Sequence, residues 1–103
     1  MTDSVFVGIT DEIPLGQSKL YQVGSFMVSV FHTEAGWFAI EDRCPHRGGP
    51  LGEGTCQGTQ VTCPWHGARF DLTTGACVSS SQISRVKTFS VTIQDPQIWV
   101  SNP

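Results

Sequence analysis

The chain has 103 residues, a length that fits one domain. Six Lys and Arg against nine Asp and Glu give a formal net charge of −3 at pH 7. This mild acidity argues against a nucleic-acid-binding protein, which usually presents a basic surface, but it permits docking to a basic partner. No apolar stretch approaches the roughly 18 residues of a membrane helix, and no signal-peptide pattern opens the chain. We therefore expect a cytoplasmic protein with reduced thiols and no membrane or nucleic-acid partner.

The first part of the chain predicts short strands with turns between them. Residues 20–23 and 26–31 are rich in apolar side chains and flank Gly24, a pattern typical of a β-hairpin. Gly36 marks a further turn, which leads into an apolar strand at residues 37–40. Nowhere do ten or more residues show apolar positions at helical spacing, so we expect no substantial helix.

The end of the chain predicts a second hairpin. Residues 89–94 alternate apolar and polar side chains, as in a half-buried strand. Asp95 and Pro96 are typical turn residues, and residues 97–100 form the expected return strand. Both ends of the chain therefore consist of strands.

The middle of the chain differs from both ends in composition. Residues from about 42 to 84 are rich in Gly, Pro, Cys and Thr and poor in apolar runs. We therefore predict one all-β domain over residues 1–103. Its antiparallel base would consist of residues 1–41 and 85–103, and the loop-rich segment at about 42–84 would be an inserted subdomain.

Two Cys/His pairs lie in this middle region and are the strongest functional signal. They are Cys44 with His46 and Cys63 with His66, and sixteen residues separate them. Each Cys precedes a Pro, which stiffens the loop, and each His is closely followed by a Gly, which permits close backbone approach. Two thiolates, two imidazoles and loops rich in N–H donors indicate a metal or iron–sulfur site. These four residues are the candidate ligands, and we assign no catalytic residue.

The two pairs and their surroundings closely resemble the Rieske family, whose pattern is C-x-H, a spacer, and C-x-x-H. The likeness continues beyond the ligands through the runs CPHRGGPLGEG and CPWHGARFDLTTG. The resemblance implies a Rieske-like base domain, an inserted cluster-binding subdomain and one [2Fe–2S] cluster. It also implies that Cys44 and Cys63 hold one iron while His46 and His66 hold the other.

Four residues around the pairs differ from those of high-potential Rieske proteins. Those proteins carry a disulfide clamp, and Gly49 and Trp65 stand at its two cysteine positions here. They also place Ser and Tyr hydroxyls near the cluster sulfurs, where this sequence has Ala68 and Phe70. Missing donors leave negative sulfur less stabilised. We therefore predict a low potential within the range of about −150 to +300 mV that Rieske clusters span.

A structural zinc site is the alternative for the four ligands, since two Cys and two His can bind Zn tetrahedrally. Zinc sites usually pair Cys with Cys and His with His, however, whereas Cys and His alternate in this chain. Two further cysteines, Cys56 and Cys77, complete no other cluster pattern. We predict that both are small buried residues on strands of the inserted subdomain, rather than a disulfide in a reducing compartment.

Other residues near the motif have a structural interpretation beside a functional one. Trp65 is interpreted as an apolar lid or a partner contact rather than a redox participant or an electron conduit. His32, at the end of a strand, is interpreted as a surface or hairpin residue rather than a ligand. Three arginines either guide a partner or pair with neighbouring acids. A run of serines replaces the Pro-containing loop of many Rieske proteins, so the rigidity of that loop is open. The arginines are Arg43, Arg47 and Arg69, the acids are Asp42, Glu53 and Asp71, and the serines are residues 79–81.

The resemblance implies an electron carrier rather than an enzyme. Small Rieske ferredoxins take one electron from an NAD(P)H-dependent flavoprotein reductase and pass it to a terminal oxygenase. The alternative is the small subunit of an NAD(P)H-dependent assimilatory nitrite reductase, which the run CPHRGGPLGEG resembles at least as well. Its partner would be the sirohaem-containing large subunit. A structural zinc-binding module is the third interpretation.

Overall fold

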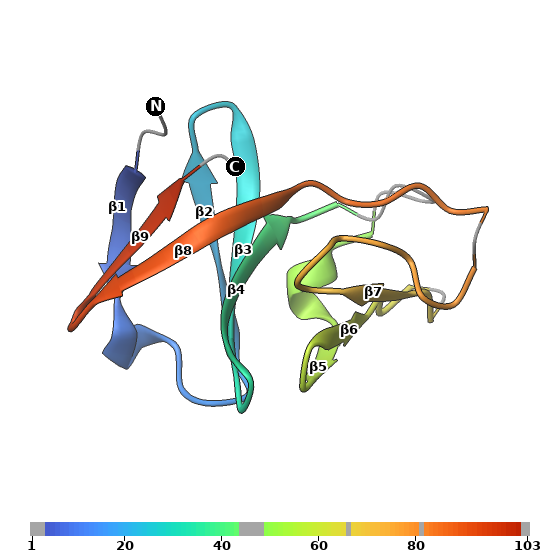
Figure 1. Cartoon of the computed structure of the whole chain (residues 1–103), viewed down its shortest axis with the longest axis horizontal. Helices are drawn as coiled ribbons and strands as arrows, with labels where there is room; N and C mark the ends of the chain where they lie inside the picture. The colour runs from blue at the N-terminus through green and yellow to red at the C-terminus, as the bar shows by residue number, and fades with distance from the viewer. Residues whose placement is uncertain (1–3, 44–48, 66, 81, 102–103) are drawn as a thin grey trace.

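The computed structural model describes residues 4–43, 49–65, 67–80 and 82–101. These residues form two antiparallel sheets and two short 3-10 helices, and they contain no α-helix (Figure 1). The all-β prediction is therefore confirmed. The strands are β1 (Ser4–Ile9), β2 (Ser18–Val23), β3 (Phe26–Thr33), β4 (Gly36–Glu41), β5 (Thr55–Gln57), β6 (Gln60–Thr62), β7 (Arg69–Asp71), β8 (Thr88–Gln94) and β9 (Gln97–Ser101), and the helices are η1 (Thr10–Glu12) and η2 (Leu51–Glu53).

The larger sheet has six strands in the order β1-β9-β8-β4-β3-β2. Both ends of the chain contribute to it, because β9 pairs with β1 and β8 pairs with β4. The two outermost strands, β1 and β2, also contact one another, so the sheet curls toward closure. The smaller sheet, β5-β6-β7, lies beside it together with η2 (Figure 1).

The predicted strands are all present, each extended by one or two residues. The first hairpin closes with Val23 opposite Phe26, and the second closes with Gln94 opposite Gln97. The sequence did not indicate β1 or the three strands of the smaller sheet. Each strand of the smaller sheet has only three residues, too few to show a periodic pattern.

Two apolar cores lie on opposite sides of β3 and β4. One core belongs to the larger sheet and consists of Ile13, Val23, Val28, Val30, Ala39, Phe89, Ile98 and Val100. The other joins that sheet to the smaller one and consists of Phe31, Ile40, Leu51, Val61, Cys63, Ala68, Phe70, Leu72 and Val86. Because neighbouring residues of a strand point to opposite faces, Val30 enters the first core while Phe31 enters the second. Strands β3 and β4 therefore form a wall shared by both cores.

Among the described residues, no helix is both long enough and apolar enough to cross a bilayer. The two helical elements are single 3-10 turns of three residues each.

Substitution of Phe31 by Ala tests how much the core between the two sheets contributes to stability. Phe31 is fully buried where the larger sheet meets the smaller one. We expect Phe31→Ala to lower the free energy of unfolding by about 3–5 kcal/mol, through lost apolar burial and a residual cavity. Urea denaturation followed by circular dichroism measures it. Phe6→Ala is the matched control, because the Phe6 side chain is 49% exposed; an equal loss in both variants would contradict the assignment of Phe31 to the core.

Candidate metal centre

Of the four predicted ligands, Cys63 lies within the described residues, whereas Cys44, His46 and His66 lie outside them. Cys63 directly follows β6 and is 1% exposed. Its backbone N–H donates to the Ala68 carbonyl at 2.7 Å, and its carbonyl accepts from the Gly67 N–H at 3.1 Å. Gly67 has a φ of +77°, which only glycine adopts without strain. These bonds fix the start and the end of the loop that contains the second predicted pair.

Gly49 brings the first predicted loop against the second. It is buried, and a Cβ atom built on it would lie 2.9 Å from Cys63 Sγ and 3.2 Å from the indole ring of Trp65. A larger residue would therefore collide with the thiol. The two segments that follow the two cysteine positions of the motif come together in space, as a shared metal site requires.

The surroundings of Cys63 fit an iron–sulfur group. Its thiol packs in the apolar core with Leu51, Ala68 and Phe70, all buried. Sulfur is a soft ligand suited to iron–sulfur clusters, and an apolar shell limits access of water to such a site. Neither Ala68 nor Phe70 has a hydroxyl group, so these two positions supply no side-chain donor to sulfur.

Trp65 lies beside this site on the surface. Its side chain is 62% exposed, although its ring lies close to buried Gly49. A large apolar group in water at the rim of a buried site is typical of a contact with a partner. The exposure of the Trp65 side chain therefore favours its interpretation as a partner contact over its interpretation as an apolar lid.

The serine-rich segment is tied to the smaller sheet. The Ser79 hydroxyl accepts a hydrogen bond from the Arg69 N–H at 3.0 Å, and the Val78 N–H donates to the Arg69 carbonyl at 2.8 Å. Ser80 accepts from the Gln82 N–H at 3.2 Å, and Ser81 lies outside the described residues. One backbone bond at Val78 and hydroxyl-to-backbone bonds at Ser79 and Ser80 therefore fix residues 78–80, where many Rieske proteins have a proline.

Cys56 and Cys77 are free and form no disulfide. Cys56 lies in β5, where burial raises the pKa of its thiol, and its Sγ lies 3.6 Å from the Gly16 carbonyl. Cys77 lies outside the named strands and bridges to Phe70 of β7. The prediction of two buried strand residues is thus wrong in part, because both cysteines are only half-buried and Cys77 follows β7 as a single bridge.

The arginines near the motif form no ion pairs in the described part of the chain. The one ion pair found there joins Lys19 to Glu12 at 3.1 Å, whereas Arg43 and Arg69 are exposed and unpaired, and Arg47 lies outside the described residues. This favours partner guidance over surface pairing for the two described arginines.

His32 lies in β3, and its position agrees with a structural role. Its Nδ1 lies 2.9 Å from the Ile13 carbonyl, and its ring stacks on Trp37 with centroids 4.0 Å apart. These contacts account for a half-buried histidine without a metal.

The role of Asp42 was not predicted from the sequence, where it was interpreted as an ion-pair partner of the nearby arginines. Its carboxylate instead accepts hydrogen bonds from the Ser29 hydroxyl and the Gly52 N–H. The available signal was its position two residues before Cys44, combined with the predicted end of a strand at residue 40.

The comparisons identify the family. Residues 3–90 match the model of the Rieske [2Fe-2S] domain, so the chain belongs to this family and carries one [2Fe–2S] cluster. This membership favours iron and sulfide over the zinc alternative. The fold agrees with it, since solved Rieske ferredoxins superpose on nearly the whole chain.

Three similar proteins are informative. The chain is 30% identical over 98 residues to a 3-phenylpropionate/cinnamic acid dioxygenase ferredoxin subunit of Photorhabdus laumondii, covering 94% of this chain and 92% of that one. It is 27% identical to a chain in a complex of oxygenase and ferredoxin in carbazole 1,9a-dioxygenase (TM-score 0.85; 95% and 92% covered). A chain from Mycobacterium tuberculosis, described as a putative NADH-dependent nitrite reductase small subunit, has a TM-score of 0.89 at 17% identity (100% and 97% covered), which shows the shared fold alone.

Asp71 provides a pH test of the loop after β7. Its Oδ1 accepts from the Thr73 N–H at 2.8 Å and from the Thr73 hydroxyl at 2.5 Å, and these bonds lower the pKa of its carboxyl below the usual 3.8. A carboxyl with a lower pKa in the folded state stabilises the fold above its unfolded pKa, and this stability is lost as the pH falls through the folded value. We expect the Tm difference between the native protein and Asp71→Asn to be constant at about pH 5–7 and to shrink below about pH 4.

Calorimetric melting of both proteins across this pH range measures the difference. Asp11→Asn is the control, since the exposed Asp11 side chain accepts no hydrogen bond from the described residues. A Tm difference for Asp71→Asn that stays level down to about pH 2 would show that the carboxylate is not stabilised in the fold.

Proposed function

We propose that this protein is a ferredoxin that passes single electrons to a terminal oxygenase. The observation that carries the proposal is the nearly end-to-end match to a dioxygenase ferredoxin subunit, of which the chain covers 92%. The exposed indole of Trp65, two residues after the buried Cys63, supports it, because a carrier needs a surface close to its redox group that a partner can reach.

The cluster would be held by Cys44 and Cys63 at one iron and by His46 and His66 at the other, within a cluster-binding subdomain at about residues 42–84. Two ferric ions, two sulfides, two thiolates and two neutral imidazoles sum to zero formal charge, so the bound group accepts one electron more readily than a four-thiolate cluster. Around it, the apolar side chains packed against Cys63 exclude water, and Gly49 admits the close approach of the two loops.

The electron donor would be an NAD(P)H-dependent flavoprotein reductase, as for similar small Rieske ferredoxins. A cytoplasmic location fits the free thiols of Cys56 and Cys77, because a reducing compartment keeps thiols unpaired. The second candidate function is the small subunit of an NAD(P)H-dependent nitrite reductase, with its large subunit as partner. The run CPHRGGPLGEG favours it, and the shared fold is compatible with it.

The potential of the cluster would be low for the Rieske class. Gly49 leaves no room for a clamp cysteine, since even a methyl group would reach Cys63 Sγ. Ala68 and Phe70 supply no hydroxyl. We expect a midpoint below about +100 mV by redox titration, and Phe70→Tyr should raise it if the added hydroxyl reaches sulfur.

Phe89→Tyr is the matched control for this titration, because Phe89 belongs to the other core and should leave the midpoint unchanged. A native midpoint well above +100 mV, an estimate from the range of such centres, would contradict the low-potential assignment.

Reconstitution tests the carrier function directly. The purified protein is mixed with NADH, a ferredoxin reductase and the oxygenase of a 3-phenylpropionate dioxygenase system, and product formation is measured. We expect turnover that depends on this protein. Trp65→Ala should slow it about tenfold, the loss typical of a buried aromatic contact, with an unchanged visible spectrum. Leu15→Ala is the matched control, since Leu15 is equally exposed at 62% but lies between η1 and β2.

One result would contradict the carrier function, and another would contradict the role of Trp65. Stable co-elution with a sirohaem-containing large subunit, without oxygenase turnover, would support the nitrite reductase alternative instead. Equal turnover by the Trp65 and Leu15 variants would exclude Trp65 from the docking surface.

A further inference from the structure

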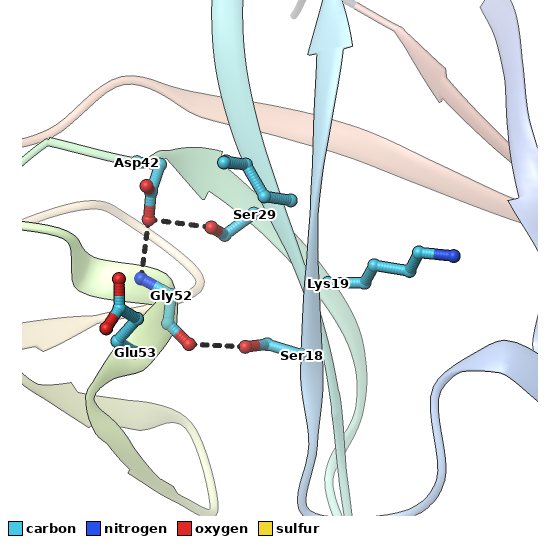
Figure 2. Close-up of a pocket in the computed structure, with 7 residues that line it drawn as sticks. Ser18, Lys19, Ser29, Asp42, Gly52 and Glu53 are labelled. Atoms are coloured by element: carbon cyan, nitrogen blue, oxygen red, sulfur yellow. Dashed lines mark hydrogen bonds between the residues drawn. The ribbon is translucent and has the colours of Figure 1, made fainter.

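The carboxylate of Asp42 lies where the larger sheet meets the segment that carries the first Cys/His pair. Asp42 directly follows β4, and its Oδ1 accepts hydrogen bonds from the Ser29 hydroxyl at 2.7 Å and the Gly52 N–H at 2.5 Å. Figure 2 shows the carboxylate between these two partners. Ser29 comes from the middle of β3 and is 1% exposed, while Gly52 belongs to η2. One oxygen atom thus connects β3, the end of β4 and η2.

Gly52 is bonded to the larger sheet through both of its polar backbone groups. Its N–H donates to Asp42, and its carbonyl accepts from the Ser18 hydroxyl of β2 at 2.5 Å (Figure 2). A Cβ atom at this position would collide with the Ser29 hydroxyl and lie 2.9 Å from Asp42 Oδ1. The absence of a side chain therefore lets η2 come within hydrogen-bond distance of the sheet.

The other end of the segment is fixed as well. The Asp42 N–H donates to the Met27 carbonyl of β3 at 2.8 Å, and the Glu41 N–H donates to the Lys87 carbonyl at 2.9 Å. Residues 42 and 52 are consequently both held on the same rigid sheet, and the Asp42 carboxylate connects them directly.

We propose that Asp42 is a positioning residue for the cluster. Its carboxylate clamps the two ends of the segment that contains Cys44 and His46, so these ligands have less conformational freedom to lose when they bind iron. The inference rests on the proposed ligand set. It assigns to Asp42 a role through hydrogen bonds to Ser29 and Gly52, not through its charge alone.

Four variants separate the hydrogen bonds from the charge. Asp42→Ala removes the acceptor, whereas Asp42→Asn keeps a side-chain oxygen but removes the charge. Ser29→Ala removes one donor from outside the segment. Ser29, Asp42 and Gly52 line a small pocket, and exposed Glu53 lines it too (Figure 2). Glu53→Gln is the control for charge, because Glu53 accepts no hydrogen bond from the described residues.

The readouts are the rate of iron release to a chelator and the EPR spectrum of the reduced cluster. Asp42→Ala should release iron about tenfold faster and broaden the EPR lines, since the buried Ser29 hydroxyl and the Gly52 N–H would lose their acceptor. Asp42→Asn should restore the native spectrum and most of the native rate. Ser29→Ala should accelerate release by a smaller factor, which keeps the test informative if Asp42→Ala does not fold. Glu53→Gln should match the native protein.

Cys63→Ser distinguishes the failure of this inference from failure of the ligand set. If Cys63→Ser loses the cluster while Asp42→Ala and Ser29→Ala release iron at the native rate, the ligand set stands and the positioning role is wrong. The role is also wrong if Asp42→Asn and Glu53→Gln accelerate release as much as Asp42→Ala, because charge would then explain the effect. If Cys63→Ser keeps a native Rieske EPR spectrum, the ligand set fails and this inference fails with it.

Discussion

The two-sided burial of β3 and β4 is the constraint on which the rest of the structure depends. A strand of an antiparallel sheet usually has one face in water, but here Val30 and Phe31 are both fully buried, in different cores. One face packs in the core of the larger sheet. The other face packs in the core that contains Leu51 and Cys63. A domain of this size has little surface to bury, and a shared wall lets the same strands stabilise both the scaffold and the metal site.

The hydrogen bonds between Asp42, Ser29 and Gly52 fix the position of η2 against β3 and β4. Apolar contacts such as that of Phe31 with the smaller sheet are non-directional and tolerate small shifts. The bonds of Asp42 to Ser29 and Gly52 are directional, and nearly complete burial of Ser29 makes an unpaired hydroxyl costly. Burial therefore holds the two sheets together, while the hydrogen bonds fix residues 42 and 52, on either side of the first predicted Cys/His pair.

The sequence predicted the features that depend on near neighbours. Both hairpins of the larger sheet were visible because alternation and turn residues are local signals. The strands of the smaller sheet were not, since Val61 and Phe70 are buried by partners distant in sequence. Asp42 shows the same limit, because its partners lie ten and thirteen residues away. Of the candidate ligands, the structure describes Cys63, a buried residue at the start of a loop, and the others rest on the motif and on family membership.

Glycine at position 49 connects the architecture of the site to its redox chemistry. The same absence of a side chain that lets the first loop approach Cys63 Sγ also removes the clamp cysteine of high-potential Rieske proteins. Without that crosslink, rigidity near the cluster has to come from other interactions. In the proposed site, the bonds of Asp42, the turn at Gly67 and the hydrogen bond between Ser79 and β7 would supply it without adding a donor at positions 68 or 70. These contacts would hold the loops without a disulfide and leave the surroundings of the sulfur atoms apolar. A cluster held in this way would have a low redox potential for the Rieske class.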